Sequence, residues 1–170
     1  MRKQKGFSLI ELLIVVAIIL IIAAIAIPNL LRSKIAANEA SAVGSLRTIN
    51  TSQVTYASTY PGTGFATSLA TLGPGGTAGN TIAAIANACL LDSVLGANSP
   101  GGSAVASANT KSGYKFYLTA TPGNPTSTYA SNANPVTVDQ TGKRYFYSDA
   151  TGVIRYNAGA IAASTDSALQ

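Results

Sequence analysis

One carboxylate stands out among the residues that could do chemistry, because it lies inside a long apolar segment. Glu11 follows the basic residues Arg2, Lys3 and Lys5, and the next charged residue along the chain is Arg32. A carboxylate in such a segment is energetically costly, so it usually has a partner or a function. The residues alone therefore single out Glu11 as the feature of this segment that needs a partner or a function.

The rest of the sequence offers little for catalysis or metal binding. There is no histidine, and Cys89 is the one cysteine, which rules out an intramolecular disulfide, a Cys/His zinc site and histidine-based catalysis. Only 10% of the residues are charged, where about a quarter is usual. We therefore predict that the chain is not an enzyme and holds no cofactor or metal. The apolar neighbours of Cys89 predict a small buried residue instead of a reactive thiol.

Two further carboxylates occur in a repeated D-x-T-G spelling, at Asp139-Gln140-Thr141-Gly142 and at Asp149-Ala150-Thr151-Gly152. Aspartate at the start of a turn and glycine in a left-handed position are typical of compact hairpin turns. A calcium ion would need about six oxygen ligands, and only these two acidic side chains are near. The pattern therefore favours structural turns over a calcium site.

The apolar segment that contains Glu11 is long enough to cross a membrane. Phe7 to Ile27 is 21 residues, or about 31 Å of helix at ~1.5 Å per residue, close to one hydrocarbon thickness. The residues alone leave three readings open: a single-span anchor, a signal peptide that ends near Ala24-Ile25-Ala26, and a span that assembles with other copies. The length argues against a buried core helix.

The charge balance is an orientation signal. The formal net charge is +5, and without Arg2, Lys3 and Lys5 the counts are 8 basic and 6 acidic residues, or +2. Basic residues before a span stay on the cytoplasmic side. We therefore predict a cytoplasmic N-terminus and no specific nucleic-acid site.

The run Lys5-Gly6-Phe7-Ser8-Leu9-Ile10-Glu11-Leu12, continued to Ile27-Pro28, resembles the processing site of type IV pilins and the related pseudopilins. The resemblance covers about the first 55 residues. It implies that a membrane aspartic peptidase, the prepilin peptidase, cleaves the Gly6–Phe7 bond and methylates the new amine of Phe7. It further implies that Glu11 pairs with the Phe7 amine of a neighbouring subunit, so that a subunit in the wrong register leaves the carboxylate unpaired.

The expected organisation has four parts: a cytoplasmic leader that is removed (1–6), a transmembrane and filament-core helix (7–28), its amphipathic continuation (29–60) and a globular head (61–170). Pro28 lacks an N–H and should kink or loosen the helix. Tyr60-Pro61-Gly62 should end it. The face that packs on the head is predicted from three- and four-residue steps to carry Leu31, Ile35, Ala42, Leu46, Ile49, Gln53, Tyr56 and Tyr60.

The head is predicted to combine short helices with an antiparallel sheet of about four strands, which makes the fold α+β. One helical turn is expected at Ser68–Leu72, and a second helix at Thr81–Leu95 with Ile82, Ile85, Cys89 and Leu90 turned inward. Residues 121–135 are expected to form a loop and residues 158–170 a loose tail. The predicted strands are Tyr114–Thr119, Val136–Val138, Arg144–Ser148 and Val153–Tyr156.

The resemblance implies a structural role. We expect a type IV pilin, and more specifically the major subunit, held in the bacterial inner membrane by one span before it joins an extracellular helical homopolymer. Its partners would be other copies of itself, the prepilin peptidase, the inner-membrane assembly machinery and, before assembly, membrane lipid. The alternatives are a pseudopilin of a type II secretion system or a minor pilin, and, in a different class, a membrane-anchored binding protein.

Overall fold

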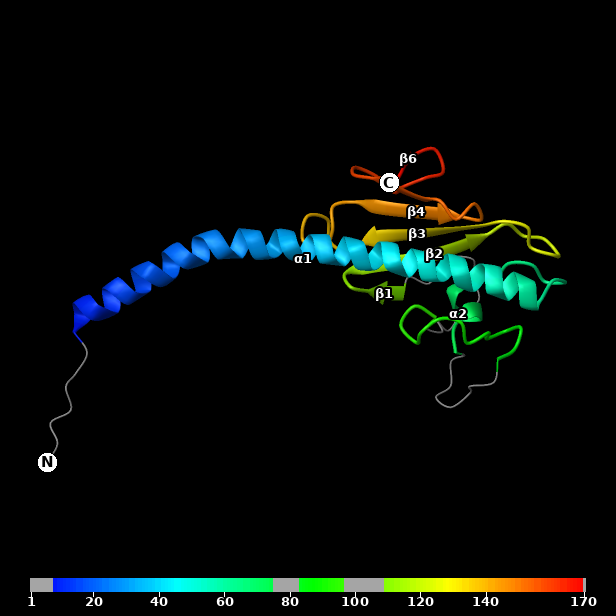
Figure 1. The fold of residues 1–170 in the computed structure, drawn as a ribbon, viewed down its shortest axis with the longest axis horizontal. Helices are drawn as coiled ribbons and strands as arrows, with labels where there is room; N and C mark the ends of the chain where they lie inside the picture. The colour runs from blue at the N-terminus through cyan, green and yellow to red at the C-terminus, as the bar shows by residue number, and fades with distance from the viewer. Residues whose placement is uncertain (1–7, 75–82, 97–108, 170) are drawn as a thin grey trace, which may run out of the picture. The chain divides into compact units, whose positions relative to one another are not determined.

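The computed structural model describes residues 8–74, 83–96 and 109–169 (Figure 1). The chain divides into two compact units, residues 1–34 and residues 35–170. Its elements are the helices α1 (Leu9–Thr59) and α2 (Leu69–Leu72) and the strands β1 (Asn109–Lys111), β2 (Tyr114–Ala120), β3 (Tyr129–Pro135), β4 (Tyr145–Asp149), β5 (Ile154–Asn157) and β6 (Ser167–Ala168). A long helix with an antiparallel sheet makes an α+β fold, as predicted.

Helix α1 is 51 residues long and contains Pro28. It ends at Thr59, just before Tyr60-Pro61-Gly62, because the residue that precedes a proline disfavours helical backbone. Tyr60 still donates its N–H to the carbonyl of Tyr56 at 2.9 Å. In residues 9–34 the large apolar side chains are exposed, whereas residues 35–59 bury one stripe.

The buried stripe follows the predicted three- and four-residue steps. Its members are Ile35, Glu39, Ala42, Val43, Ser45, Leu46, Ile49, Ser52, Gln53 and Tyr56. Gln53 is fully buried because its side-chain amide is paired with the backbone of Ala66, donating to the carbonyl at 3.0 Å and accepting from the N–H at 2.8 Å. The prediction was wrong for Leu31, which is exposed, and Tyr60 is only half-buried.

Within the described residues the sheet has six antiparallel strands in the order β1-β2-β3-β4-β5-β6, where about four were predicted. Each strand pairs with its neighbours in the sequence, for example Leu118 of β2 with Ser131 of β3. Strand β2 alternates as predicted, with Tyr114, Phe116 and Leu118 buried. These side chains join Leu46, Ile49, Tyr56, Tyr129, Ala133, Phe146 and Ile154 in one core between α1 and the sheet.

The third strand lies where the sequence predicts a loop. Residues 129–135 form β3, and Val136–Val138, predicted as a strand, lies outside the named strands with Val136 and Val138 exposed. The sequence of β3 contains few β-branched or aromatic residues. Its inward-facing Ser131 and Ala133 are nevertheless fully buried between β2 and β4. Residues 129–135 therefore form a strand because they pair with β2 and β4 on both edges, although their intrinsic propensity for strand is weak.

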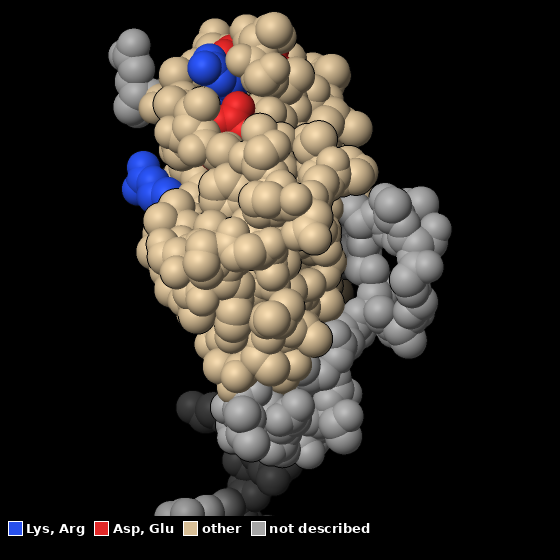
Figure 2. Space-filling model, turned by 90° about the vertical axis from the view of Figure 1, so that its right-hand side faces the viewer, with Lys and Arg blue, Asp and Glu red and all other residues tan. Residues whose placement is uncertain are grey.

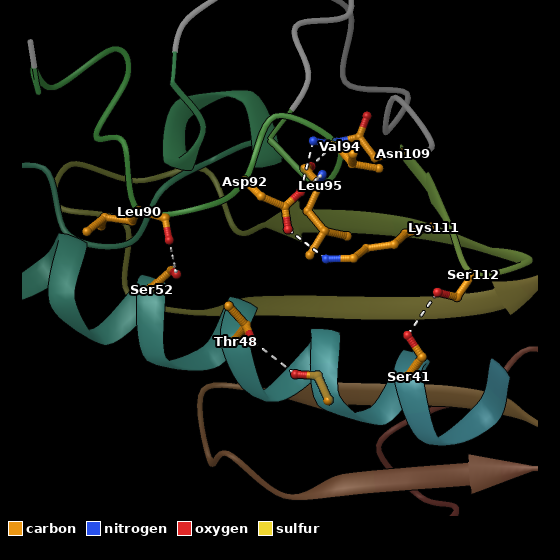
Figure 3. Close-up of polar contacts among 11 residues, drawn as sticks. Ser41, Thr48, Ser52, Leu90, Asp92, Val94, Leu95, Asn109, Lys111 and Ser112 are labelled. Carbon is orange, nitrogen blue, oxygen red and sulfur yellow. Dashed lines mark hydrogen bonds and ion pairs between the residues drawn. The ribbon is translucent and has the colours of Figure 1, made fainter. Parts of the chain in front are cut away.

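The helix predicted at Thr81–Leu95 is absent from residues 83–96, and residues 81 and 82 lie outside the described part. The segment is instead attached to α2 and α1: Leu90 donates its N–H to the carbonyl of Leu72 at 2.8 Å and accepts from the Ser52 hydroxyl at 3.1 Å (Figure 3). Backbone groups used in these contacts are not available for helical bonds. The prediction of a buried Cys89 is also wrong, because Cys89 and Ile85 are exposed.

Figure 3 shows how the same segment is fixed to the edge of the sheet. The Asp92 carboxylate accepts from the N–H groups of Val94 and Leu95, both at 2.9 Å, and pairs with the Lys111 ammonium at 2.6 Å. Although partial burial opposes it, the bond from Lys111 holds the pKa of Asp92 below its ordinary value. The side chain of Asn109 donates to the carbonyl of Leu95. Residues 92–95 are thus tied to β1.

Candidate functional site: the N-terminal helical segment

The predicted assembly residue Glu11 lies in the first turn of α1, while Gly6 and Phe7 lie outside the described residues. Its Oε2 accepts a hydrogen bond from the backbone N–H of Ser8 at 2.9 Å. The first N–H groups of a helix lack intrahelical partners, and a carboxylate at this end also interacts favourably with the helix dipole. In the single chain, the Glu11 carboxylate therefore serves as the acceptor for a free N–H group at the N-terminus of its own helix.

This contact is half of a capping box, and the sequence carries its signature. Serine at the N-cap and glutamate three residues later, as in Ser8 and Glu11, match the S-x-x-E spacing in which the glutamate reaches back to the N-cap amide. Sequence reasoning singled out Glu11 and missed Ser8. Among the ion pairs of the described residues, none involves Glu11.

The apolar side chains that follow Glu11 are open to solvent. An 18-residue window of α1 has a mean hydropathy of 3.3, so the helix is long and apolar enough to cross a membrane. The exposed fraction is 80% for Leu9, 62% for Leu13 and 66% for Ile25. Exposed apolar surface of this extent marks a membrane or protein contact. Contact with lipid or other protein would therefore be needed to cover the segment.

Helix α1 continues through Pro28. Because proline has no N–H, the helical hydrogen bond to the carbonyl of Ala24 is missing. One turn later the Ser33 hydroxyl donates to the carbonyl of Asn29 at 3.0 Å. Pro28 thus weakens the hydrogen-bond ladder where the apolar segment ends.

A buried carboxylate that sequence reasoning missed joins α1 to the sheet within residues 35–170. Glu39, 6% exposed, accepts from the N–H of Lys143 at 2.9 Å and from that of Arg144 at 3.2 Å. The Arg144 guanidinium completes a two-pronged ion pair, with Nε and Nη2 each 2.7 Å from Oε2. It also lies 5.5 Å from the ring centres of Phe146 and Tyr156. The spacing in the sequence could have indicated the burial of Glu39, because it lies four residues after Ile35 on the buried stripe.

The two D-x-T-G turns differ in structure. The turn at Asp149 joins β4 to β5 as predicted: Oδ1 accepts from the N–H of Thr151 at 2.9 Å, and Gly152 has φ of 74°. The turn at Asp139 lies in the longer connection before β4, and its left-handed residue is Asp139, φ 64°, instead of Gly142. Gly142 is required for space, because a Cβ there would collide with the Tyr114 ring.

The described residues contain no group of three or more His, Cys, Asp or Glu side chains that could hold a metal ion. Asp139 is paired with Lys143 at 3.6 Å, and Asp149 accepts from its own turn. Partial burial raises the pKa of Asp149, but the bonds from Thr151 outweigh it and leave the pKa below its ordinary value. Both carboxylates therefore have structural partners within the chain.

Residues 1–27 match the family described as the prokaryotic N-terminal methylation motif. The chain is 64% identical over 39 residues to the type IV wide pilus major component PilA4 of Thermus thermophilus, an alignment covering 23% of this chain and 30% of that protein. It is 44% identical over 54 residues to the type IV major pilin protein PilA of Myxococcus xanthus, covering 32% of this chain and 24% of that protein.

The chain thus matches about a quarter to a third of the length of these curated relatives. No solved structure gives a significant match. The family match at residues 1–27 covers Gly6, Phe7 and Glu11. Together with the two pilin relatives, it confirms the predicted resemblance to the type IV pilin family.

Proposed function

We propose that the chain is the major structural subunit of a type IV pilus. The observation that carries the proposal is the methylation motif at residues 1–27, which runs into an exposed apolar helix with one carboxylate near its start. The two relatives described as major pilus components support the major role. The chain acts as a substrate and a building block, with no reaction of its own.

The first step is processing by the prepilin peptidase. The leader, residues 1–6, holds Arg2, Lys3 and Lys5 on the cytoplasmic side of the inner membrane. Cleavage of the Gly6–Phe7 bond and methylation leave a cationic amine on Phe7. Glycine suits the cleaved position because it has no side chain to obstruct the peptidase.

The second step transfers the apolar helix from lipid to protein. Residues 7–28 span the membrane as a store of subunits, with the amphipathic part (29–60) and the head (61–170) outside the cytoplasm. The inner-membrane machinery then adds each subunit to a helical homopolymer, where exposed side chains such as Leu13 and Ile25 contact other copies.

The third step is a change of partner for Glu11. Its carboxylate accepts from a neutral amide, the Ser8 N–H, in the single chain. In the filament it pairs with the methylated amine of Phe7 on a neighbouring copy. Leaving a charge unpaired in a low-dielectric bundle is strongly unfavourable, so the pair selects the correct register.

The composition of surface filaments tests the major role. Filaments sheared from cells that produce this chain should consist mainly of it by quantitative mass spectrometry, and deletion of its gene should abolish them. A chain found at trace level in the filaments, or filaments that persist without it, would contradict the proposal and indicate a minor pilin or a pseudopilin.

A further inference from the structure

The outer face of the sheet, opposite α1, has a shallow hollow at the end where β2 and β4 stop. Its volume is about 640 Å³, and its lining includes Thr119, Thr128, Ala130, Tyr147, Asp149 and Ser164. We call it the Tyr147 hollow. All of these residues belong to the unit formed by residues 35–170.

The strand register explains why the surface is hollowed here. Ala130 of β3 lies between Thr119 of β2 and Asp149 of β4, and alternation places all three on the face that does not meet the core. Alanine is the smallest side chain in this row. The larger side chains of Thr119, Asp149 and Tyr147 therefore surround a depression above Ala130.

The lining groups suit a ligand that carries hydroxyl groups. The hydroxyls of Thr121 and Thr128 are 2.7 Å apart on one side. On the other side, Oδ1 of Asp149 is held by the N–H of Thr151 at 2.9 Å and by its hydroxyl at 2.5 Å. Among the described residues, the one contact of Oδ2 is a long one of 3.4 Å, from the Tyr147 hydroxyl. A carboxylate oxygen with spare acceptor capacity binds hydroxyl donors well.

The charges in and around the hollow argue for a neutral ligand. Among the described residues that line it there is no lysine or arginine, so an anion has no partner there. The Asp149 charge is already opposed by the positive charge of Arg155, which pairs with Tyr147 in the register. Figure 2 views the molecule from this end: most of the described surface is uncharged, and the acidic side chains in view lie in its upper part beside a basic one.

We propose that the Tyr147 hollow binds a neutral saccharide, with the Tyr147 ring against a C–H face of the sugar and the Asp149 carboxylate accepting from its hydroxyls. Sites of this class combine an aromatic surface with a few fixed polar groups. An open, solvent-facing hollow of this size fits one or two sugar rings. The proposal concerns the head alone and does not depend on the filament role.

The test uses the full mature chain in a detergent without a sugar headgroup, titrated with cellobiose, lactose and chitobiose as neutral probes. Sialyllactose and putrescine serve as the anionic and cationic probes. At least one neutral disaccharide should bind saturably, with Kd on the order of 1 mM. No saturable binding by any neutral probe, or tighter binding of putrescine or sialyllactose, would overturn the proposal.

Three variants and two controls locate the binding. Tyr147→Ala and Asp149→Asn should each weaken it about tenfold, and Ala130→Leu should block it by filling the floor. The matched controls are Tyr145→Ala, on the same strand and face but outside the hollow, and Asp139→Asn in the other D-x-T-G turn. If the controls lower affinity as much as the first three, or if Ala130→Leu binds normally while circular dichroism shows an intact fold, the site is refuted.

Discussion

Glu39 and Arg144, 105 residues apart in the sequence, are joined by two contacts of 2.7 Å between α1 and the residue that precedes β4. The carboxylate of Glu39 is buried, whereas the Arg144 side chain is 39% exposed. The pair therefore fixes the register between the helix and the sheet at the start of the buried stripe. It holds the head on the part of α1 that follows the apolar segment.

Glu39→Ala should lower the free energy of unfolding by about 3 kcal/mol, because it removes the partner of Arg144 and the acceptor of two backbone N–H groups. Urea unfolding of the mature chain, followed by near-ultraviolet circular dichroism, measures this. Lys143→Ala is the control: its pair with Asp139 is exposed on both sides, so the change should stay within about 0.5 kcal/mol. Equal effects in the two variants would refute a special role for Glu39.

Two buried tyrosines should make the fold sensitive to alkali. Burial raises the pKa of Tyr129 to about 12, and the nearby negative charge of Asp149 raises it in the same direction. The pKa of Tyr114 is raised mainly by burial and, to a smaller extent, by the negative charge of Glu39. A phenol whose pKa is raised on folding stabilises the fold below its ordinary value of about 10. That contribution is lost as the pH rises from about 10 toward 12.

Phenolate absorbance should accordingly rise in two phases, with the phenols of Tyr129 and Tyr114 ionising in the second phase, near the loss of structure. Tyr129→Phe should remove part of the second phase. A single phase centred near the ordinary tyrosine pKa would contradict the burial of these phenols.

Two glycines should respond in opposite directions to the same substitution. Gly142→Ala should destabilise the head by about 2 kcal/mol, because its Cβ would displace the Tyr114 ring from the core. Gly44→Ala should stabilise it by about 0.5–1 kcal/mol, because Gly44 lies on an exposed face of α1 with nothing within 4 Å. Thermal unfolding of both variants tests this, and a change in stability of the same sign in both would contradict the prediction.

The elements that the sequence predicts well are those with a strong local signal. The buried stripe from Ile35 to Tyr56 follows from spacing, the end of α1 from Tyr60-Pro61-Gly62, and β2 from the alternation at Tyr114, Phe116 and Leu118. The Ser68–Leu72 turn also forms, with the Ser68 hydroxyl accepting from the N–H of Thr71 at its start. Local chemistry is sufficient for each.

The elements that were predicted wrongly depend on distant partners. Strand β3 forms because β2 and β4 pair with it on both edges. Residues 83–96 do not form a helix because their polar groups are hydrogen-bonded to α1, α2 and β1. In the candidate site, Glu11 stood out because it is charged within an apolar run. Glu39 did not, because its partner Arg144 is 105 residues away.

Glu11→Ala should leave cleavage of the leader intact while it impairs filament assembly. The proposed cleavage site of the peptidase is the Gly6–Phe7 bond, whereas the proposed role of the carboxylate is to pair with the amine of another copy. Glu11→Gln is the matched variant: it keeps the shape and a possible contact to the Ser8 N–H but removes the charge. Normal filament yield from Glu11→Gln would refute the ion pair, and uncleaved chain in either variant would place Glu11 in processing.

We propose that the chain becomes a filament subunit by cleavage after Gly6. Tandem mass spectrometry of the N-terminal peptide from sheared filaments tests it most directly, with Gly6→Val as the control that should accumulate uncleaved in the membrane. The filament subunit should begin with N-methylated Phe7. A filament subunit that begins at any other residue, or a Gly6→Val chain of mature mass, would contradict it.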